Sequence, residues 1–128
     1  MNILIDTHIV IWFITNDAKL PKRLKSIIED PNNKCFVSIA TYWELSIKYS
    51  LGRLNLNSSI EEFFNIIEVS GFDILPITLN HILQLTTLEH HHNDPFDRLI
   101  IAQSISENLS VASVDNYFTA YKIQMVQY

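Results

Sequence analysis

The sequence predicts an α/β protein in which helices wrap a parallel β-sheet. Short apolar runs alternate along the chain with segments of helical periodicity, a pattern typical of sheets that are buried on both faces. The 128 residues are 48% hydrophobic and include only two Gly and four Pro. This length and composition fit one buried core and leave no linker, repeat or low-complexity segment. We therefore expect a single domain over residues 1–128.

Five apolar runs predict the strands. The first run stops at Asp6, and the fourth leads directly to Asp115. Strands of a parallel sheet are near-continuous apolar segments rather than alternating ones, which is what these runs show. The expected strands are residues 2–5, 35–37, 72–77, 110–114 and 124–127.

Six helices are expected between the strands, at residues 7–14, 21–30, 38–51, 58–69, 79–88 and 94–108. The first is too uniformly apolar to assign by its period, but Asp6 or Thr7 suits its N-cap. The second is a surface helix with Leu24, Ile27 and Ile28 on one face. Ser38 caps the third and Gly52 ends it. An apolar stripe runs along this third helix, formed by Ile39, Trp43, Ile47 and Leu51.

The sixth helix begins with two carboxylates. Pro95 suits the first helical position, where its missing N–H costs nothing, so Asp94 falls at the N-cap. The buried side follows at helical spacing, with Phe96, Leu99, Ile100 and Gln103. Asp97 has no comparable structural task in this pattern. It lies at the helix N-terminus and hence at the edge of the domain, where active sites of parallel α/β folds are found.

Four carboxylates are candidates for one shared site. Asp6 and Asp115 each follow a predicted strand, so both face the crevice at the carboxyl ends of the strands. Asp97 and Glu44 reach the same crevice if their helices start from that edge. Oxygen-only acidic clusters suit Mg²⁺ or Mn²⁺, and such a site hydrolyses phosphodiesters by activating water.

Each of these acids also has a purely structural interpretation. Asp97 could pair with Arg98 or interact with the helix dipole, Asp115 could cap the turn at Asn116, and Glu44 could pair with Lys48 one helical turn later. Each interpretation is reasonable alone, but all of them holding together is a weaker account than one common site.

The net charge of −5 speaks against general affinity for nucleic acid. The charge is uneven, however, because residues 1–53 carry seven of the nine basic residues against five acids. A surface that binds nucleic acid would have to come from a sparse set of cations, which are Lys19, Lys22, Arg23, Lys25, Lys48, Arg53 and Arg98. Such a set indicates modest nonspecific affinity and recognition through shape or a few contacts.

Histidine and cysteine offer little to a metal site. Three consecutive side chains, His90 to His92, cannot converge on one ion in regular structure, although their loop near Asp97 could touch substrate. His8 could line the crevice, but a packed or solvent-facing histidine is the expected role. The lone Cys35 lies in an apolar run and is expected to be a buried small hydrophobe. With no apolar run of about 18 residues and no leader pattern, we expect a cytoplasmic protein without a membrane partner.

These residues together resemble the PIN-domain ribonucleases, in particular the VapC-like toxins of toxin–antitoxin pairs. The resemblance covers nearly the whole chain. It rests on LIDTH from residue 4, VSIA from 37, WELSIK from 43, LGRL from 51, HHNDPFDRLIIAQ from 91 and VASVD from 111.

The resemblance implies a three-layer α/β/α sandwich with a central parallel sheet, and cleavage of single-stranded RNA by metal-activated water. It implies Mg²⁺ as the cofactor, with Mn²⁺ as a substitute. Asp6 and Asp97 correspond to the principal metal ligands, Glu44 and Asp115 to ligands or water-orienting groups, and Thr7 and Ser38 to supporting hydroxyls. Members of the family commonly form homodimers and are inhibited by a small antitoxin that covers the acidic crevice.

Two other functional classes compete with a nuclease. A catalytically silent PIN-like binding module would keep the fold without chemistry, although the complete set of acids argues against it. A phospho-receiver or phosphatase-like domain would accept a phosphoryl group on Asp6. That class is less consistent with the sequence, because position 8 is His rather than a second Asp and no Lys follows a late strand.

Overall fold

Four parallel strands form the sheet in the computed structural model, which describes residues 1–128. They are β1 (Asn2–Ile5), β2 (Lys34–Ser38), β3 (Asp73–Leu75) and β4 (Ser110–Ala112), in the order β3-β2-β1-β4. Four of the five predicted strands are thereby confirmed. The prediction of a strand at residues 124–127 is wrong. That segment exchanges only two backbone bonds with Val111, which gives an isolated bridge at Met125 rather than a ladder.

All six predicted helices are present, most of them slightly shorter than expected. They are α1 (Thr7–Thr15), α2 (Lys22–Glu29), α3 (Ile39–Ser50), α4 (Ile60–Val69), α5 (Leu79–Thr86) and α6 (Pro95–Glu107). A short 3₁₀ helix that the sequence analysis did not predict, η1 (Asn116–Ala120), follows β4. None of the helices combines the length and the apolar character that crossing a bilayer requires.

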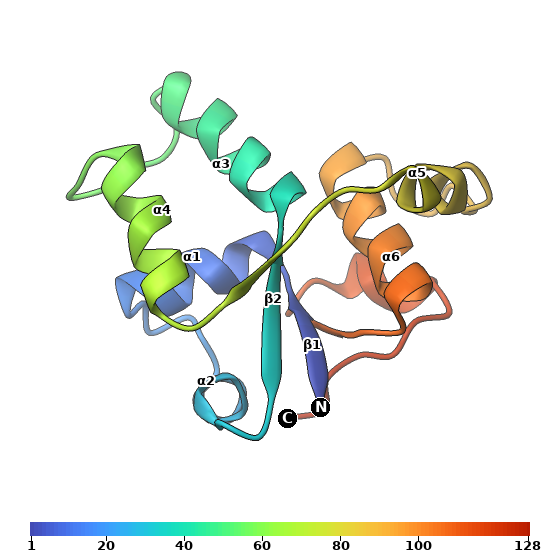
Figure 1. The fold of residues 1–128 in the computed structure, drawn as a ribbon, viewed down its shortest axis with the longest axis horizontal. Coiled ribbons are helices and arrows are strands. Elements are labelled where there is room, and N and C mark those ends of the chain that lie inside the picture. The colour runs from blue at the N-terminus through green and yellow to red at the C-terminus, as the bar shows by residue number, and fades with distance from the viewer.

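The sheet is the middle layer of a three-layer α/β/α arrangement, as predicted. Side chains alternate across β1, so that Ile3 and Ile5 join one apolar cluster and Leu4 joins the other. The first cluster includes residues of α1, α2 and α4, and the second includes residues of α6 and η1. Figure 1 shows α1 and α4 on one side of β1 and β2, with α5 and α6 on the other.

The strand order places a topological switch point at the carboxyl ends of β1 and β4. The chain builds outward from β1 through β2 to β3 and then crosses back to place β4 on the other side of β1. Open parallel sheets bind ligands at the carboxyl ends of the strands where the strand order reverses in this way. The ends of β1 and β4 therefore frame the position where Asp6 and the residues after β4 lie.

Capping side chains fix where the helices around this edge of the sheet begin. The Ser38 hydroxyl accepts a hydrogen bond from the Ala40 amide at 3.0 Å, so α3 starts immediately after β2. Asp94 accepts from the amides of Phe96 and Asp97 at 2.9 and 3.0 Å, which confirms its predicted N-cap role. These contacts satisfy donors that a helix N-terminus otherwise leaves unpaired.

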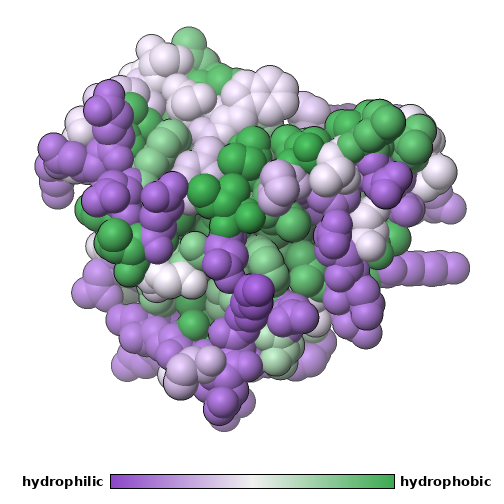
Figure 2. Space-filling model, in the orientation of Figure 1, coloured by the Kyte–Doolittle hydropathy of each residue, from purple (hydrophilic) through white to green (hydrophobic).

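The apolar stripe of α3 lies on the surface. Trp43 and Leu51 are 56% and 59% exposed, and Ile39 and Ile47 are more than one-third exposed. The inner face of α3 is instead lined by Ala40, Thr41, Glu44 and Leu45. A further apolar surface lies over α5, where Leu79 and Leu83 are exposed (Figure 2).

The lone cysteine is buried, as predicted. Cys35 on β2 is 6% exposed and belongs to the apolar cluster that α1, α2 and α4 cover. Burial raises the pKa of its thiol to about 11, so the thiolate is disfavoured near neutral pH. The side chain therefore packs as a small hydrophobe.

Two leucines, Leu45 in α3 and Leu51 at its C-cap, distinguish a buried position from an exposed one. Leu45 is fully buried, so Leu45→Ala should lower the free energy of unfolding by about 2–5 kcal/mol, because it removes buried methyl groups and leaves a cavity. Leu51→Ala, at an exposed position, should change it by less than about 0.5 kcal/mol. Urea denaturation of both variants measures the difference, and equal losses would contradict the assignment of the buried face.

Candidate active site

Asp6 lies where β1 ends and α1 begins, beside the end of β4. Its amide donates to the Ala112 carbonyl at 3.0 Å, which extends the pairing of β1 with β4 by one residue. Although Asp6 occupies the N-cap position of α1, its carboxylate makes no capping hydrogen bond. The side chain is therefore available for another task.

The Asp6 carboxylate is almost completely buried, with 2% exposure. Its Oδ2 accepts a hydrogen bond from the Ser113 hydroxyl at 2.8 Å, whereas its Oδ1 has no partner. The pKa of Asp6 is raised from 3.8 to about 6, chiefly by burial and to a smaller extent by the negative charges of Glu44 and Asp115, while the hydrogen bond from Ser113 opposes the increase. The charges of two of the other three predicted site residues therefore affect the pKa of Asp6.

Asp97 lies in the first turn of α6, where Asp94 already caps the helix. Its Oδ2 lies 2.7 Å from Nε2 of His92. Burial raises the pKa of Asp97 to about 6, and the charges of Asp6, Asp94 and Glu44 add to the increase, while the hydrogen bond to His92 opposes it. The structure therefore brings Asp97 into the same negative field as Asp6 and Glu44.

Glu44 projects from the inner face of α3 and is 8% exposed. Lys48 binds its Oε2 at 3.2 Å, which confirms the predicted pair one helical turn apart. The other oxygen, Oε1, is buried without a partner. The structural role and the site role of Glu44 are therefore compatible, because each uses a different oxygen.

Asp115 is only partly buried and caps the short helix η1. Its Oδ1 accepts from the Tyr117 amide at 3.0 Å, so the capping role proposed from the sequence is confirmed. Its own amide donates to the hydroxyl of Ser113, the same hydroxyl that binds Asp6. Ser113 thus links the two acids. The sequence analysis did not single it out, and its only signal was a hydroxyl at the carboxyl end of a strand beside Asp115.

The two hydroxyls predicted to support the site act between helices and strands instead. Thr7 bonds Thr41 of α3 at 2.9 Å, and both side chains are buried. Ser38 bonds the side chain of Gln103 in α6. Neither hydroxyl contacts a carboxylate of the site. They fasten α3, which carries Glu44, to α1, and α6, which carries Asp97, to β2.

Of the cations expected on an RNA-facing surface, Lys48 binds Glu44, whereas Arg98 is buried. Arg98 is 8% exposed, so its predicted place on that surface is wrong, and the structural alternative in which it pairs with Asp97 does not hold. Its Nη1 donates to the Glu89 carbonyl at 2.9 Å and to the Tyr121 hydroxyl at 3.1 Å. Helix α2, whose first turn contains Lys22, Arg23 and Lys25, lies near the amino end of β2, at the opposite end of the strand from its carboxyl end (Figure 1).

Asp6, Glu44 and Asp97 share one arrangement, in which a single protein side chain holds one carboxylate oxygen. In Asp6 and Glu44 the other oxygen is buried without a partner. Unpaired buried oxygens are costly unless a ligand satisfies them, and carboxylate oxygens are the ligands that Mg²⁺ and Mn²⁺ prefer. The donor set fits a hard divalent cation. The groups are neighbours rather than a closed set, because no three of them already converge on one point.

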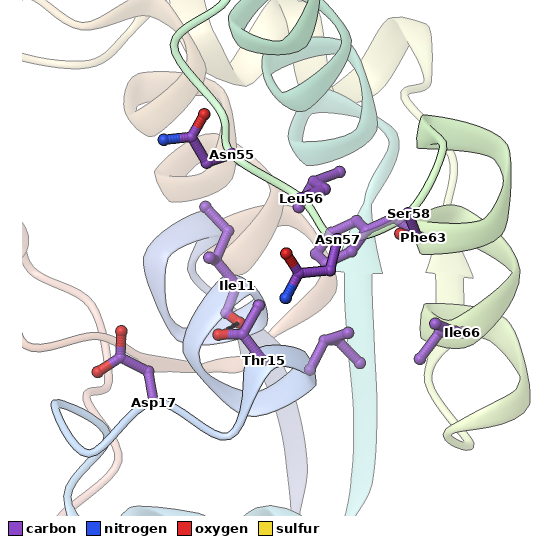
Figure 3. Close-up of a pocket in the computed structure, with 10 residues that line it drawn as sticks. Ile11, Thr15, Asp17, Asn55, Leu56, Asn57, Ser58, Phe63 and Ile66 are labelled. Carbon is purple, nitrogen blue, oxygen red and sulfur yellow. Dashed lines mark hydrogen bonds between the residues drawn. The ribbon is translucent and has the colours of Figure 1, made fainter.

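The largest cavity lies elsewhere and contains none of these acids. It has a volume of about 600 Å³ between α1, the segment at residues 55–58 and α4 (Figure 3). Its lining is half apolar, with Ile11, Ile14, Leu56, Phe63 and Ile66. This cavity and the carboxylates are therefore separate features of the molecule.

The sequence model of the PIN domain family matches residues 3–123. The chain belongs to the PIN domain family. This PIN domain has the same fold as chains in three solved structures. One is VapBC2 from Rickettsia felis bound to a DNA fragment from its promoter, with a TM-score of 0.72 and 16% identity over 99% of this chain and 98% of that one. The second is VapBC-1 from nontypeable Haemophilus influenzae, with a TM-score of 0.68 and 22% identity over 99% of this chain and 98% of that one. The third is a toxin–antitoxin complex from Klebsiella pneumoniae, with a TM-score of 0.63 and 17% identity over 97% of this chain and 95% of that one. Comparison with curated protein sequences gave no match.

The raised pKa values predict how the stability of this PIN domain depends on pH. A carboxyl with a native pKa of about 6 and an ordinary value of 3.8 binds its proton more tightly in the folded state, so stability falls as pH rises through that window. Asp6→Asn removes this penalty. In EDTA at about pH 7.5 the variant should be more stable than the wild type by up to roughly 3 kcal/mol, and the gain should vanish at about pH 4.

Chemical denaturation at both pH values measures this difference. Asp73→Asn, at an exposed carboxylate of β3, is the control and should retain the pH dependence of the wild type. A stability gain of Asp6→Asn that is equal at both pH values would contradict the burial of an ionised Asp6.

Proposed function

We propose that this PIN domain is a Mg²⁺-dependent endoribonuclease that hydrolyses phosphodiester bonds of single-stranded RNA. The observation that carries the proposal is the set of half-satisfied, buried carboxylates at the sheet edge. Asp6 Oδ1 and Glu44 Oε1 are buried without partners, and burial, with a smaller contribution from mutual repulsion, raises the pKa of Asp6 and Asp97. A divalent cation would supply the missing positive charge. Membership of the PIN family and the fold shared with VapBC chains support this proposal.

Asp6 and Asp97 are the proposed principal ligands for Mg²⁺ or Mn²⁺. Glu44 and Asp115 would act as further ligands or as acceptors that orient water. When bound, the ion supplies a Lewis acid and lowers the pKa of water so that it can attack a phosphodiester. The chain contributes the orientation of the acids. Ser113 holds Asp6, Lys48 holds Glu44 and His92 holds Asp97.

We propose single-stranded RNA as the substrate on chemical grounds and by the family resemblance. The chain has a net charge of −5, and helix α2 with its cations lies near the amino end of β2. Affinity for a long duplex through its phosphates is therefore weak. Unpaired RNA offers bases that can stack, and exposed aromatic side chains flank the site at Trp43 and Tyr117.

We further propose that a protein antitoxin controls the enzyme. One solved structure of the same fold is described as a toxin–antitoxin complex, which supports this partner. The half-apolar cavity between α1 and α4 and the excess of negative charge would suit a partner segment with apolar and basic side chains. The homodimer and the cytoplasmic location remain predictions.

Cleavage of a mixed single-stranded RNA pool tests the proposed activity. The wild type should cut in Mg²⁺ or Mn²⁺ and stop in EDTA. The cleavage rate of Asp97→Asn should fall by more than about 10–100-fold, which is the loss that follows when a residue that only orients a metal ligand is removed. Asp94→Asn is a matched control in the same turn, because Asn caps helices as well as Asp does. Metal-independent cutting, or equal activity of Asp97→Asn and Asp94→Asn, would refute the proposal.

Expression in a bacterial host tests the toxin role. The wild type, produced without an antitoxin, should arrest growth, whereas Asp6→Asn and Asp97→Asn should permit growth although they accumulate to the same level. Growth curves together with immunoblots give the result. Arrest by all three proteins would show that the effect is not due to the carboxylate site.

A further inference from the structure

The loop that precedes α6 is fastened by contacts that do not involve its histidine rings. Arg98 Nη1 donates to the Glu89 carbonyl at 2.9 Å, and the Tyr121 hydroxyl donates to the same carbonyl at 2.8 Å. The backbone amides of His91 and His92 donate to the Tyr121 hydroxyl at 3.1 and 3.2 Å. Arg98 and Tyr121 are both buried, so the backbone of this loop is anchored from the interior.

The ring of His92 is held separately, between Tyr117 and Asp97. It stacks on the Tyr117 ring with centroids 4.3 Å apart and planes 7° from parallel. Its Nε2 lies 2.7 Å from Asp97 Oδ2. The Tyr117 amide is bound in turn by Asp115. The ring therefore connects two of the four acids of the proposed site, and it makes no hydrogen bond with Arg98 or Tyr121, whose side chains anchor the loop backbone.

The neighbouring histidines are placed differently. The His91 ring lies 2.7 Å from Oε2 of Glu89, whose side chain is 79% exposed, and it packs edge-on against Tyr121. His90 is exposed and makes no side-chain hydrogen bond. Of the three, only His92 meets a carboxylate of the site. The sequence could not single it out, because all three residues lie in one irregular loop.

We propose that His92 is a positioning residue, whose Nε2–H fixes Asp97 by one oxygen and leaves Oδ1 available for the cation. An ionised carboxylate only accepts hydrogen bonds, so Nε2 is the donor in this pair. The bond restricts rotation of the Asp97 side chain and offsets part of the free-energy cost of burying its charge. Groups that orient the ligands of a metal in this way usually affect metal affinity as well as rate. This inference rests on the proposed function.

Two substitutions separate the hydrogen bond from the packing of the ring. His92→Phe keeps an aromatic ring against Tyr117 and removes the donor. His92→Gln removes the ring and keeps an N–H at a reach similar to that of Nε2. His90→Phe is the matched control in the same loop. Isothermal titration with Mn²⁺ alone measures metal affinity without any requirement for turnover, and thermal unfolding in EDTA confirms that each variant is folded.

His92→Phe should weaken Mn²⁺ binding and lower kcat for RNA cleavage by about 10–100-fold, with an unfolding midpoint near that of the wild type. His92→Gln should recover part of both losses, and His90→Phe should match the wild type. Full activity and affinity in His92→Phe would overturn the inference and leave the nuclease intact, as would equal losses in His92→Phe and His92→Gln. A wild type that neither binds Mn²⁺ nor cleaves RNA would overturn the proposed function as well.

Discussion

The concentration of negative charge at one buried edge of the sheet is the constraint on which the rest of this molecule depends. A parallel sheet brings the carboxyl ends of β1 and β4 to the same edge, and Asp6 follows β1 directly. A carboxylate with 2% exposure beside other carboxylates is unfavourable, and its pKa of about 6 expresses that cost. A fold selected for stability alone would hold apolar side chains here. The acids at this edge therefore support the proposed catalytic role.

The surrounding structure binds one of the two oxygens of each of three carboxylates. Ser113, Lys48 and His92 come from three different segments, and each binds one oxygen of Asp6, Glu44 or Asp97, respectively. The remaining oxygens of Asp6 and Glu44 are buried without a partner. A fully paired set would be a structural ion-pair network, and a fully unpaired set would be too mobile to define a site. The intermediate arrangement is oriented and still open to a ligand, which is the property that a metal-dependent hydrolase requires.

Much of this architecture could be predicted from the sequence, because uniform apolar runs specify parallel strands and Ser38 and Asp94 are strong caps. The sequence also indicated that Asp6 and Asp115 share an edge. It could not indicate that Arg98 turns inward to Glu89 and Tyr121, since a charged residue in a first helical turn is normally solvated. Nor could it reveal that Ser113 binds Asp6, 107 positions earlier in the chain, or that His92 binds Asp97, five positions later. Both bonds depend on how the loops fold back.

The central claim is that Asp6, Glu44 and Asp97 together bind a divalent cation. A crystal of the wild-type protein grown with Mn²⁺, and its anomalous difference map collected near the manganese edge, tests this claim most directly. The account predicts a peak at the carboxyl edge of the sheet, in contact with oxygens of Asp6 and Asp97, and no such peak in Asp97→Asn under the same conditions. A map without a peak at this edge, or with an equal peak in the variant, would contradict it.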